Sequence, residues 1–244
     1  MVKLKKIIGI ICALAMSMSF GVLAACGGGG DSTSSGGTQD STQSDTQGGG
    51  NSSGTSAETP AGAKDYILEA ENIDLSYVVG GDTSANPSGA SLITANDKMS
   101  GGKFIRALYV NELFFEFEFV CDKAVDDAVI TFSFAGEIKD FELFDDEFQI
   151  YVNPELDEDT YEPIDRETRI KYGSVSLTAD YTPREYKIAE GVSLKEGKNI
   201  IYCQVYNTES LAPSYSTMNA KAPMIDYLKI NTTATVVHTT YENE

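Results

Sequence analysis

The sequence contains no tryptophan and a single histidine, His238. Catalysis by a serine or cysteine nucleophile commonly depends on a neighbouring imidazole, and His238 lies in a polar stretch near the C-terminus. Cysteines are also few: there are four, with no CxxC spacing and no cluster with histidine, which argues against a zinc site. These shortages disfavour Ser–His, Cys–His and zinc chemistry.

Positive charge is also scarce. Lys and Arg number 18 against 37 Asp and Glu, which gives a net charge of −19 over 244 residues. Such an acidic surface repels phosphate groups, so the composition argues against binding nucleic acid or anionic lipid head groups. It favours solubility and suits cation binding.

The first 25 residues have the features of an export signal. Three lysines and no acid occupy Met1–Lys6, and residues 7–22 are almost wholly apolar or small but too few to span a membrane well. Leu23-Ala24-Ala25-Cys26 follows, and this motif resembles the bacterial lipobox. The resemblance implies cleavage before Cys26, acylation of that cysteine, and a lipid-anchored location outside the cytoplasm at the cell membrane. A secretory signal with a chance cysteine is the alternative.

Residues 26–63 are predicted to form a disordered linker. After Cys26 this segment is built almost entirely from Gly, Ser, Thr, Gln, Asn and Asp, with no large apolar residue. It cannot bury enough surface to offset its chain entropy, and it should span roughly 35 Å as a random coil. The rest of the chain has the length of one domain.

The remaining chain alternates apolar and polar residues in short runs, a period of two that is typical of half-buried strands. These runs are Phe115–Phe119, Ile130–Phe134, Phe148–Val152, Ile201–Val205 and the closing Met224–Ile230. Turn-forming residues separate them, and no helical period of useful length occurs. The pattern predicts an all-β sandwich or jelly roll over residues 64–233, followed by a polar C-terminal tail at 234–244.

Two cysteines remain in this domain once Cys12 leaves with the signal and Cys26 takes the lipid. Cys121 and Cys203 each lie on the apolar face of a predicted strand. Because disulfides are permitted in exported proteins, a buried disulfide and two buried free thiols stay equally open.

An acid-rich segment occupies residues 136–172, including Asp145-Asp146-Glu147. No glycine stands where an EF-hand loop requires one. We therefore interpret the segment as a solvated acidic loop rather than as a calcium-binding loop.

Glu69 and Glu71 stand two residues apart in a predicted strand, so their carboxylates should point to the same side. Two carboxylates held so close repel each other unless a cation or hydrogen bonds compensate. Calcium prefers such oxygen ligands. The alternative is a solvated strand face.

Four segments carry a resemblance to a known family. They are Tyr66–Glu71, Ser100–Ile105, Val192–Ile201 and Met224–Ile230. In this order they resemble the carbohydrate-binding modules of families 6 and 35. The resemblance implies a galactose-binding-like jelly roll with a structural calcium. It assigns the ion to Glu69, Glu71 and Asp226, together with backbone carbonyls from the loop before Ser100.

The same resemblance implies that glycans bind to loops at one end of the sandwich. There an aromatic ring stacks on a sugar face and an amide or carboxylate fixes the hydroxyl groups. With no tryptophan, the thirteen tyrosines supply the candidates. We expect the site at Tyr206, Asn207 and Tyr215, with Tyr151 and Asn153 at a strand end as secondary candidates. Core packing is the alternative for each tyrosine.

The function predicted from the sequence is a non-catalytic lipoprotein that binds a polysaccharide or glycan, with surface glycan-degrading enzymes as candidate partners. A structural or protein-interaction jelly roll without a glycan site is the alternative. An enzyme ranks third, because carboxylate pairs can hydrolyse glycosides but 37 acids make no pair distinctive. One all-β domain is small for the two-lobed binding lipoprotein of a transporter.

Overall fold

The computed structural model describes residues 61–78, 89–108, 112–137, 140–206 and 221–243. Within these ranges no helix is both long enough and apolar enough to cross a membrane. The predicted lipidation site Cys26 lies outside the described residues, as do Asn207 and Tyr215.

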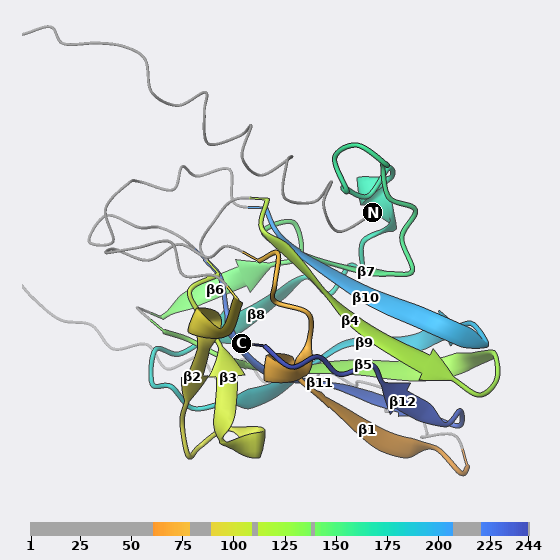
Figure 1. Ribbon diagram of the computed structural model, residues 1–244, viewed down its shortest axis with the longest axis horizontal. Helices are drawn as coiled ribbons and strands as arrows, with labels where there is room; N and C mark the ends of the chain where they lie inside the picture. Colours follow the sequence, from red (N-terminus) through yellow and green to blue (C-terminus); the bar gives the residue numbers. More distant parts are fainter. Residues whose placement is uncertain (1–60, 79–88, 109–111, 138–139, 207–220, 244) are drawn as a thin grey trace, which may run out of the picture.

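Two antiparallel sheets pack against each other around the core (Figure 1). The larger sheet runs in the order β2-β3-β11-β5-β9, and β1 also pairs with β11. Its strands are β1 (Lys64–Glu69), β2 (Ile93–Ala95), β3 (Lys103–Ile105), β5 (Val125–Ala135), β9 (Arg184–Leu194) and β11 (Met224–Thr232). The first strand of the domain therefore lies beside one of its last.

The smaller sheet runs in the order β12-β4-β10-β7, and a separate pair joins β6 to β8. These strands are β4 (Phe114–Cys121), β6 (Phe141–Phe144), β7 (Phe148–Val152), β8 (Ser174–Leu177), β10 (Gly197–Val205) and β12 (Val236–His238). The described helical turns are short 3-10 turns, namely η1 (Ala70–Asn72), η2 (Gly89–Leu92), η3 (Ser100–Gly102) and η4 (Arg166–Thr168).

Phenylalanine rings fill the space between the sheets. Phe115 and Phe117 of β4 are fully buried, as their alternation predicts. The Phe117 ring meets Phe132 of β5 edge-on at 5.8 Å, and Phe134 meets Phe148 of β7 at 5.6 Å. Truncating one such ring to alanine costs about 3–5 kcal/mol. The prediction of an all-β jelly-roll sandwich is confirmed, and the five alternating runs are β4, β5, β7, β10 and β11.

The segment 234–244 is not the polar tail that the sequence predicts. Its strand β12 pairs with β4 and extends the smaller sheet. Near the end of the chain, the Asn243 amide donates hydrogen bonds to the carbonyls of Glu71 and Ile73, each at 2.9 Å. The domain therefore includes these residues. A three-residue edge strand is too short to show a period in the sequence.

Cys121 and Cys203 are buried free thiols. The register of β4 against β10 explains why: Gly197 lies opposite Cys121, whereas Cys203 lies opposite Phe115. Six residues of strand, or about 20 Å, separate the two positions, and a disulfide needs Cα atoms within about 7 Å.

Part of the acid-rich segment covers the outer face of the smaller sheet. The Tyr161 ring stacks on Phe114 with centroids 6.1 Å apart, and the Tyr161 carbonyl accepts a hydrogen bond from the Tyr202 hydroxyl at 3.1 Å. The segment 136–172 also contains β6 and β7. The interpretation as a solvated loop is therefore correct only for part of it.

Candidate cation site and ligand-binding end

The candidate cation site lies where β1, the η3 turn and β11 meet. β1 ends at Glu69 and Glu71 lies in the following 3-10 turn, so the expectation that both stand on one strand is wrong. The turn still brings both carboxylates to Gly101, where a Cβ atom would lie 2.9 Å from Glu71 Oε1 and 3.9 Å from Glu69 Oε2. Gly101 has a φ of 62°, a conformation that favours glycine. This close approach therefore depends on the missing side chain.

Each of these glutamates has one oxygen that is buried and has no hydrogen-bond partner among the residues that the structure describes. This is Oε2 of Glu69 and Oε2 of Glu71, and Glu71 as a whole is only 9% exposed. The other oxygen of Glu69 accepts a hydrogen bond from the Ser100 hydroxyl at 2.7 Å. Burying an ionised carboxylate without a partner is costly, and a cation between the two would compensate both.

Asp226, the third predicted ligand, lies at the same turn but in a different situation. Its Oδ1 accepts a hydrogen bond from the Ser100 backbone N–H at 2.8 Å, and its Oδ2 accepts one from the Ser133 hydroxyl at 2.9 Å. The residue is 2% exposed. Both of its oxygens therefore have partners within the protein.

Burial dominates the electrostatics of this site. It raises the pKa of Asp226 to about 6 against the opposing hydrogen bonds from Ser133 and Ser100, and the charges of Glu69 and Glu71 add to the rise. Burial is also the largest cause of the raised pKa of Glu71, to which the charge of Glu69 contributes. Neighbouring negative charge thus disfavours the ionised forms of Asp226 and Glu71, and a bound cation would relieve that repulsion.

The donor atoms at this site are all oxygens, which suits calcium rather than zinc. Among the described residues, no three His, Cys, Asp or Glu side chains are grouped closely enough to hold a metal by themselves. Glu69 and Glu71 would therefore supply the carboxylates, while backbone carbonyls and water complete the about six to eight oxygens that calcium takes. A bound ion would supply the positive charge that fixes β1 to the η3 turn.

Two of the predicted glycan-binding residues are used inside the protein. Tyr151 is fully buried and its hydroxyl is hydrogen-bonded to a neighbouring side chain, so its ring is not available to stack on a sugar. The alternation of β7 points it outward, but residues 153–172 lie over that face. The Asn153 side chain donates to Asn199 Oδ1 and accepts from the Ile200 backbone N–H, each at 2.9 Å. Both residues therefore act in folding rather than in binding.

Tyr206 directly follows β10 and is partly exposed. The Arg166 guanidinium lies 4.1 Å from the centroid of its ring, so a cation covers one face of the ring. Its backbone N–H donates to the Glu147 carbonyl at 2.7 Å. Tyr206 therefore stands at the end of the sandwich that carries the turn between β6 and β7.

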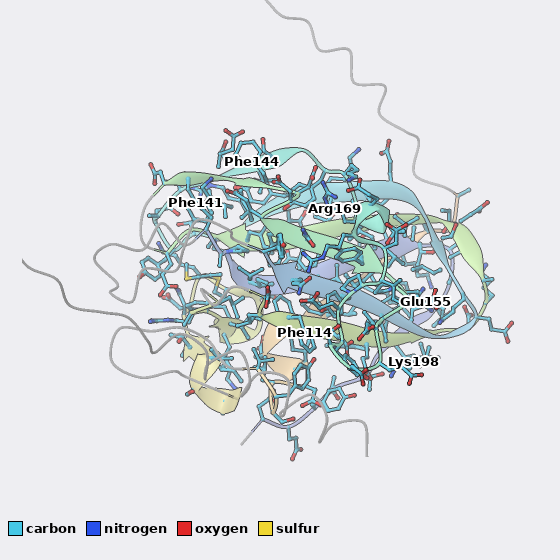
Figure 2. All side chains as sticks on the ribbon, turned by 90° about the horizontal axis from the view of Figure 1, so that it is seen from above. Phe114, Phe141, Phe144, Glu155, Arg169 and Lys198 are labelled. Carbon is cyan, nitrogen blue, oxygen red and sulfur yellow. The ribbon has the colours of Figure 1, made fainter. Side chains whose placement is uncertain are left out.

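The same end carries an exposed ring that the sequence interpretation missed. Phe144 is 40% exposed, and Lys221 Nζ lies 5.3 Å from its centroid and 2.6 Å from Glu147 Oε1. Figure 2 shows Phe141 and Phe144 near each other at the rim of the molecule. Two phenylalanines three residues apart among the acids were the available signal. They do not alternate with polar residues, so the strand pattern did not select them.

Comparison with known proteins gives matches only in structure. No family model and no curated protein matches the sequence. A family 35 carbohydrate-binding module from Cellvibrio japonicus Abf62 is 15% identical with a TM-score of 0.42, covering 71% of this chain and 97% of its own. A family 35 module from Clostridium thermocellum is 16% identical with a TM-score of 0.42, covering 69% and 98%.

A larger protein also matches in part. The GH26-CBM35 β-(1,4)-mannanase of Podospora anserina is 12% identical with a TM-score of 0.43 over 69% of this chain, which spans 28% of the mannanase. What each of these proteins binds or cleaves is a property of that protein.

Proposed function

We propose that the chain is a non-catalytic, surface-anchored lipoprotein whose calcium-stabilised β-sandwich binds a polysaccharide or glycan. The observation that supports this most is at Gly101, where two carboxylates converge, each with a buried oxygen that no described residue hydrogen-bonds. They belong to Glu69 and Glu71, which the sequence resemblance to families 6 and 35 assigns to a structural calcium. A sequence motif and a local geometry thus point to the same class of protein.

In this proposal calcium holds the start and the end of the domain together. β1 pairs with β11 along its whole length, and Glu69 stands opposite Tyr227 in the last pair. The ion would fix that end of β1 to the η3 turn, which is hydrogen-bonded to β11 through Asp226. Its role would be structural, because the ion would join elements from the start and the end of the domain.

We place the glycan at the end of the sandwich that carries Tyr206 and Phe144. Sugars bind to exposed aromatic rings through their apolar faces, while neighbouring polar groups hydrogen-bond their hydroxyls. Arg166 beside Tyr206, and Lys221 and Glu147 beside Phe144, supply such groups. Asn207 and Tyr215, named from the sequence, remain part of this proposal.

A glycan array in the presence of calcium tests the proposal. The probe is the chain with Cys26→Ser, which takes no lipid. We expect binding to at least one plant, host or microbial glycan. Tyr206→Ala and Phe144→Ala should each weaken that binding about tenfold, which corresponds to about 1.4 kcal/mol for a stacked ring.

Tyr181→Ala is the matched control, because Tyr181 is as exposed as Phe144 but lies between β8 and β9. Tyr181→Ala should bind the glycan as strongly as the chain with Tyr206 and Phe144 both intact. Binding that survives both Tyr206→Ala and Phe144→Ala would move the site elsewhere. Failure to bind any glycan would refute the function.

A protein-interaction role is the second candidate, and one observation favours it. Val120 and Val237 stand opposite each other on β4 and β12 and are 44% and 62% exposed. Neighbouring exposed apolar side chains suit a protein partner. An array without hits, together with capture of a partner that is lost in Val237→Lys, would support this role.

The membrane anchor is tested by Cys26→Ala in the producing cell. Acylation with two or more chains gives stable anchoring. The wild-type chain should therefore remain with the membrane fraction and take up labelled palmitate, whereas the variant should do neither. Retention of label in the variant would refute acylation at Cys26.

A further inference from the structure

β11 contains one extra residue at Asp226. Ile225 pairs with Phe134 of β5, and Tyr227 pairs with the preceding residue of β5, Ser133. Asp226 therefore has no register partner on β5. A β-bulge of this kind re-aims the side chain it carries. Here it directs the Asp226 carboxylate away from the core and toward the η3 turn.

The two oxygens of Asp226 join two separate parts of the chain. Oδ2 is bound by the Ser133 hydroxyl of β5, and Oδ1 is bound by the backbone N–H of Ser100 at the start of the η3 turn. The Ser100 hydroxyl in turn donates to Glu69 Oε1 at 2.7 Å. We call Ser100, Ser133 and Asp226 the Asp226 bridge. It connects the sheet to Glu69 through hydrogen bonds alone.

Glu69 and Glu71 differ from Asp226 in the atoms they leave available. Within the described part of the chain, each has a buried oxygen without a hydrogen-bond partner, whereas both oxygens of Asp226 accept hydrogen bonds at normal distances. A buried oxygen without a partner gains from a cation outright. An oxygen that already accepts a hydrogen bond has to share or lose it.

We propose that Asp226 is a positioning residue of the calcium site and not one of its ligands: the Asp226 bridge holds the η3 turn against Glu69, and Glu69 and Glu71 bind the ion. This differs from the role that the sequence resemblance assigns to Asp226, and it rests on the calcium of the proposed function. It also gives a role to Ser133, whose hydroxyl donates its hydrogen bond to Asp226 rather than to either glutamate.

The test is a calorimetric titration of calcium into the chain carrying Cys26→Ser. Glu71→Gln removes a ligand and should abolish measurable binding. Ser133→Ala and Asp226→Ala should each weaken binding about tenfold to a hundredfold, the range typical of residues that orient a metal ligand. The double variant should bind no more weakly than Asp226→Ala alone, because both changes break the same bridge.

Two further variants separate positioning from general damage. Ser133→Thr keeps the hydroxyl and should restore binding to near the wild-type level. Ser176→Ala removes a serine hydroxyl from the exposed face of β8, outside the bridge, and should leave the calcium affinity unchanged. Each variant is first checked for a cooperative thermal unfolding transition, so that a loss of fold is not read as a loss of affinity.

Three results would overturn the proposal. Asp226→Ala abolishing binding as fully as Glu71→Gln, while Ser133→Ala has no effect, would make Asp226 a ligand. Ser133→Thr binding as weakly as Ser133→Ala would remove the role of the hydroxyl. A wild-type chain that binds no calcium would refute the calcium of the proposed function and this inference with it, and the wild-type titration alone identifies that case.

Discussion

The molecule holds acids in two very different ways. At the end of β1, Glu69 and Glu71 each bury an oxygen that has no hydrogen-bond partner among the described residues. In the acid-rich segment 136–172, by contrast, several acids have partners: Asp145 accepts from Arg169 and Gly173. Among the described acids of the second region, Glu137 also buries an oxygen, but its Oε1 lies 3.1 Å from Arg106 Nε, so its charge is already compensated.

The pKa values of the two regions move in opposite directions. Burial raises the pKa of Glu71. In the acid-rich segment, hydrogen bonds from the Thr160 backbone and hydroxyl lower the pKa of Asp157. A high local density of acids is therefore a poor guide to a cation site. What matters is whether the fold has already provided each carboxylate with donors.

Removing calcium should give the largest effect and should act on the first region alone. At a calcium concentration of about 100 times Kd, binding stabilises the fold by about 2.7 kcal/mol. For a domain of this size a chelator should therefore lower Tm by roughly 5–10 °C. Differential scanning calorimetry with and without chelator measures the change.

Two variants show which of the two regions causes the difference in Tm between calcium and chelator. Glu71→Gln should abolish the difference between calcium and chelator, whereas Asp157→Asn should leave it intact. If the calcium-dependent shift in Tm disappeared in Asp157→Asn but persisted in Glu71→Gln, the ion would bind in the acid-rich segment and not at Glu71.

Asn243 should stabilise the backbone around Glu71, in the first region, whereas residues of the acid-rich segment should not. Its side chain accepts from the Leu75 N–H at 3.0 Å and donates to the carbonyls of Glu71 and Ile73. Asn243→Ala leaves these backbone groups without partners and should cost about 2 kcal/mol in urea unfolding. An unchanged unfolding midpoint would show that the end of the chain does not hold this segment.

His238 extends the comparison to a basic side chain, whose ring is partly exposed but has one buried nitrogen. Its Nε2 is buried and unbonded among the described residues, and burial lowers its pKa from 6.5 to about 4. The folded state therefore keeps His238 neutral while the unfolded chain takes up a proton below pH 6.5. Stability is lost as the pH falls from about 6.5 to about 4.

The measurement is urea unfolding in chelator at pH 7 and at pH 4.5, for wild type and His238→Phe. Because the side chain is partly exposed, the loss attributable to His238 should be about 1 to 2 kcal/mol. The difference between the two proteins isolates this residue from the carboxylates. Equal losses in both would mean that His238 titrates normally in the folded state.

The smallest effect distinguishes the two kinds of acid directly. In chelator, Glu71→Gln removes a charge that is repelled by Glu69 and should raise stability by about 1 kcal/mol. Asp157→Ala removes an acceptor of three hydrogen bonds, from Asp159 and Thr160, and should lower stability. Changes of the same sign in both variants would contradict the distinction.

The strands of the core were predictable because each buries one face. The alternation of Phe115–Phe119 gives the strand β4, and its inward residues are all fully buried. What lies on the outer face was not predictable in the same way. Tyr151 points outward from β7, but residues 153–172 cover it, and a strand pattern contains no information about which loop lies above it.

The candidate site was predictable in its residues but not in its geometry. Glu69, Glu71 and Asp226 were named, yet the 3-10 turn after β1 and the bulge at Asp226 were not. The sequence did contain one signal for the bulge. The core residues Ile225 and Leu228 are three positions apart, whereas residues on one face of a regular strand are two positions apart. The serines of the Asp226 bridge carry no pattern, because a hydrogen bond between distant strands depends on register.

Anomalous diffraction from crystals grown in calcium would show whether Glu69 and Glu71 bind the ion. We predict one strong peak beside Gly101, about 2.3 to 2.6 Å from an oxygen of Glu69 and an oxygen of Glu71. A peak among the acids of residues 136–172, or no peak at Gly101, would contradict this prediction.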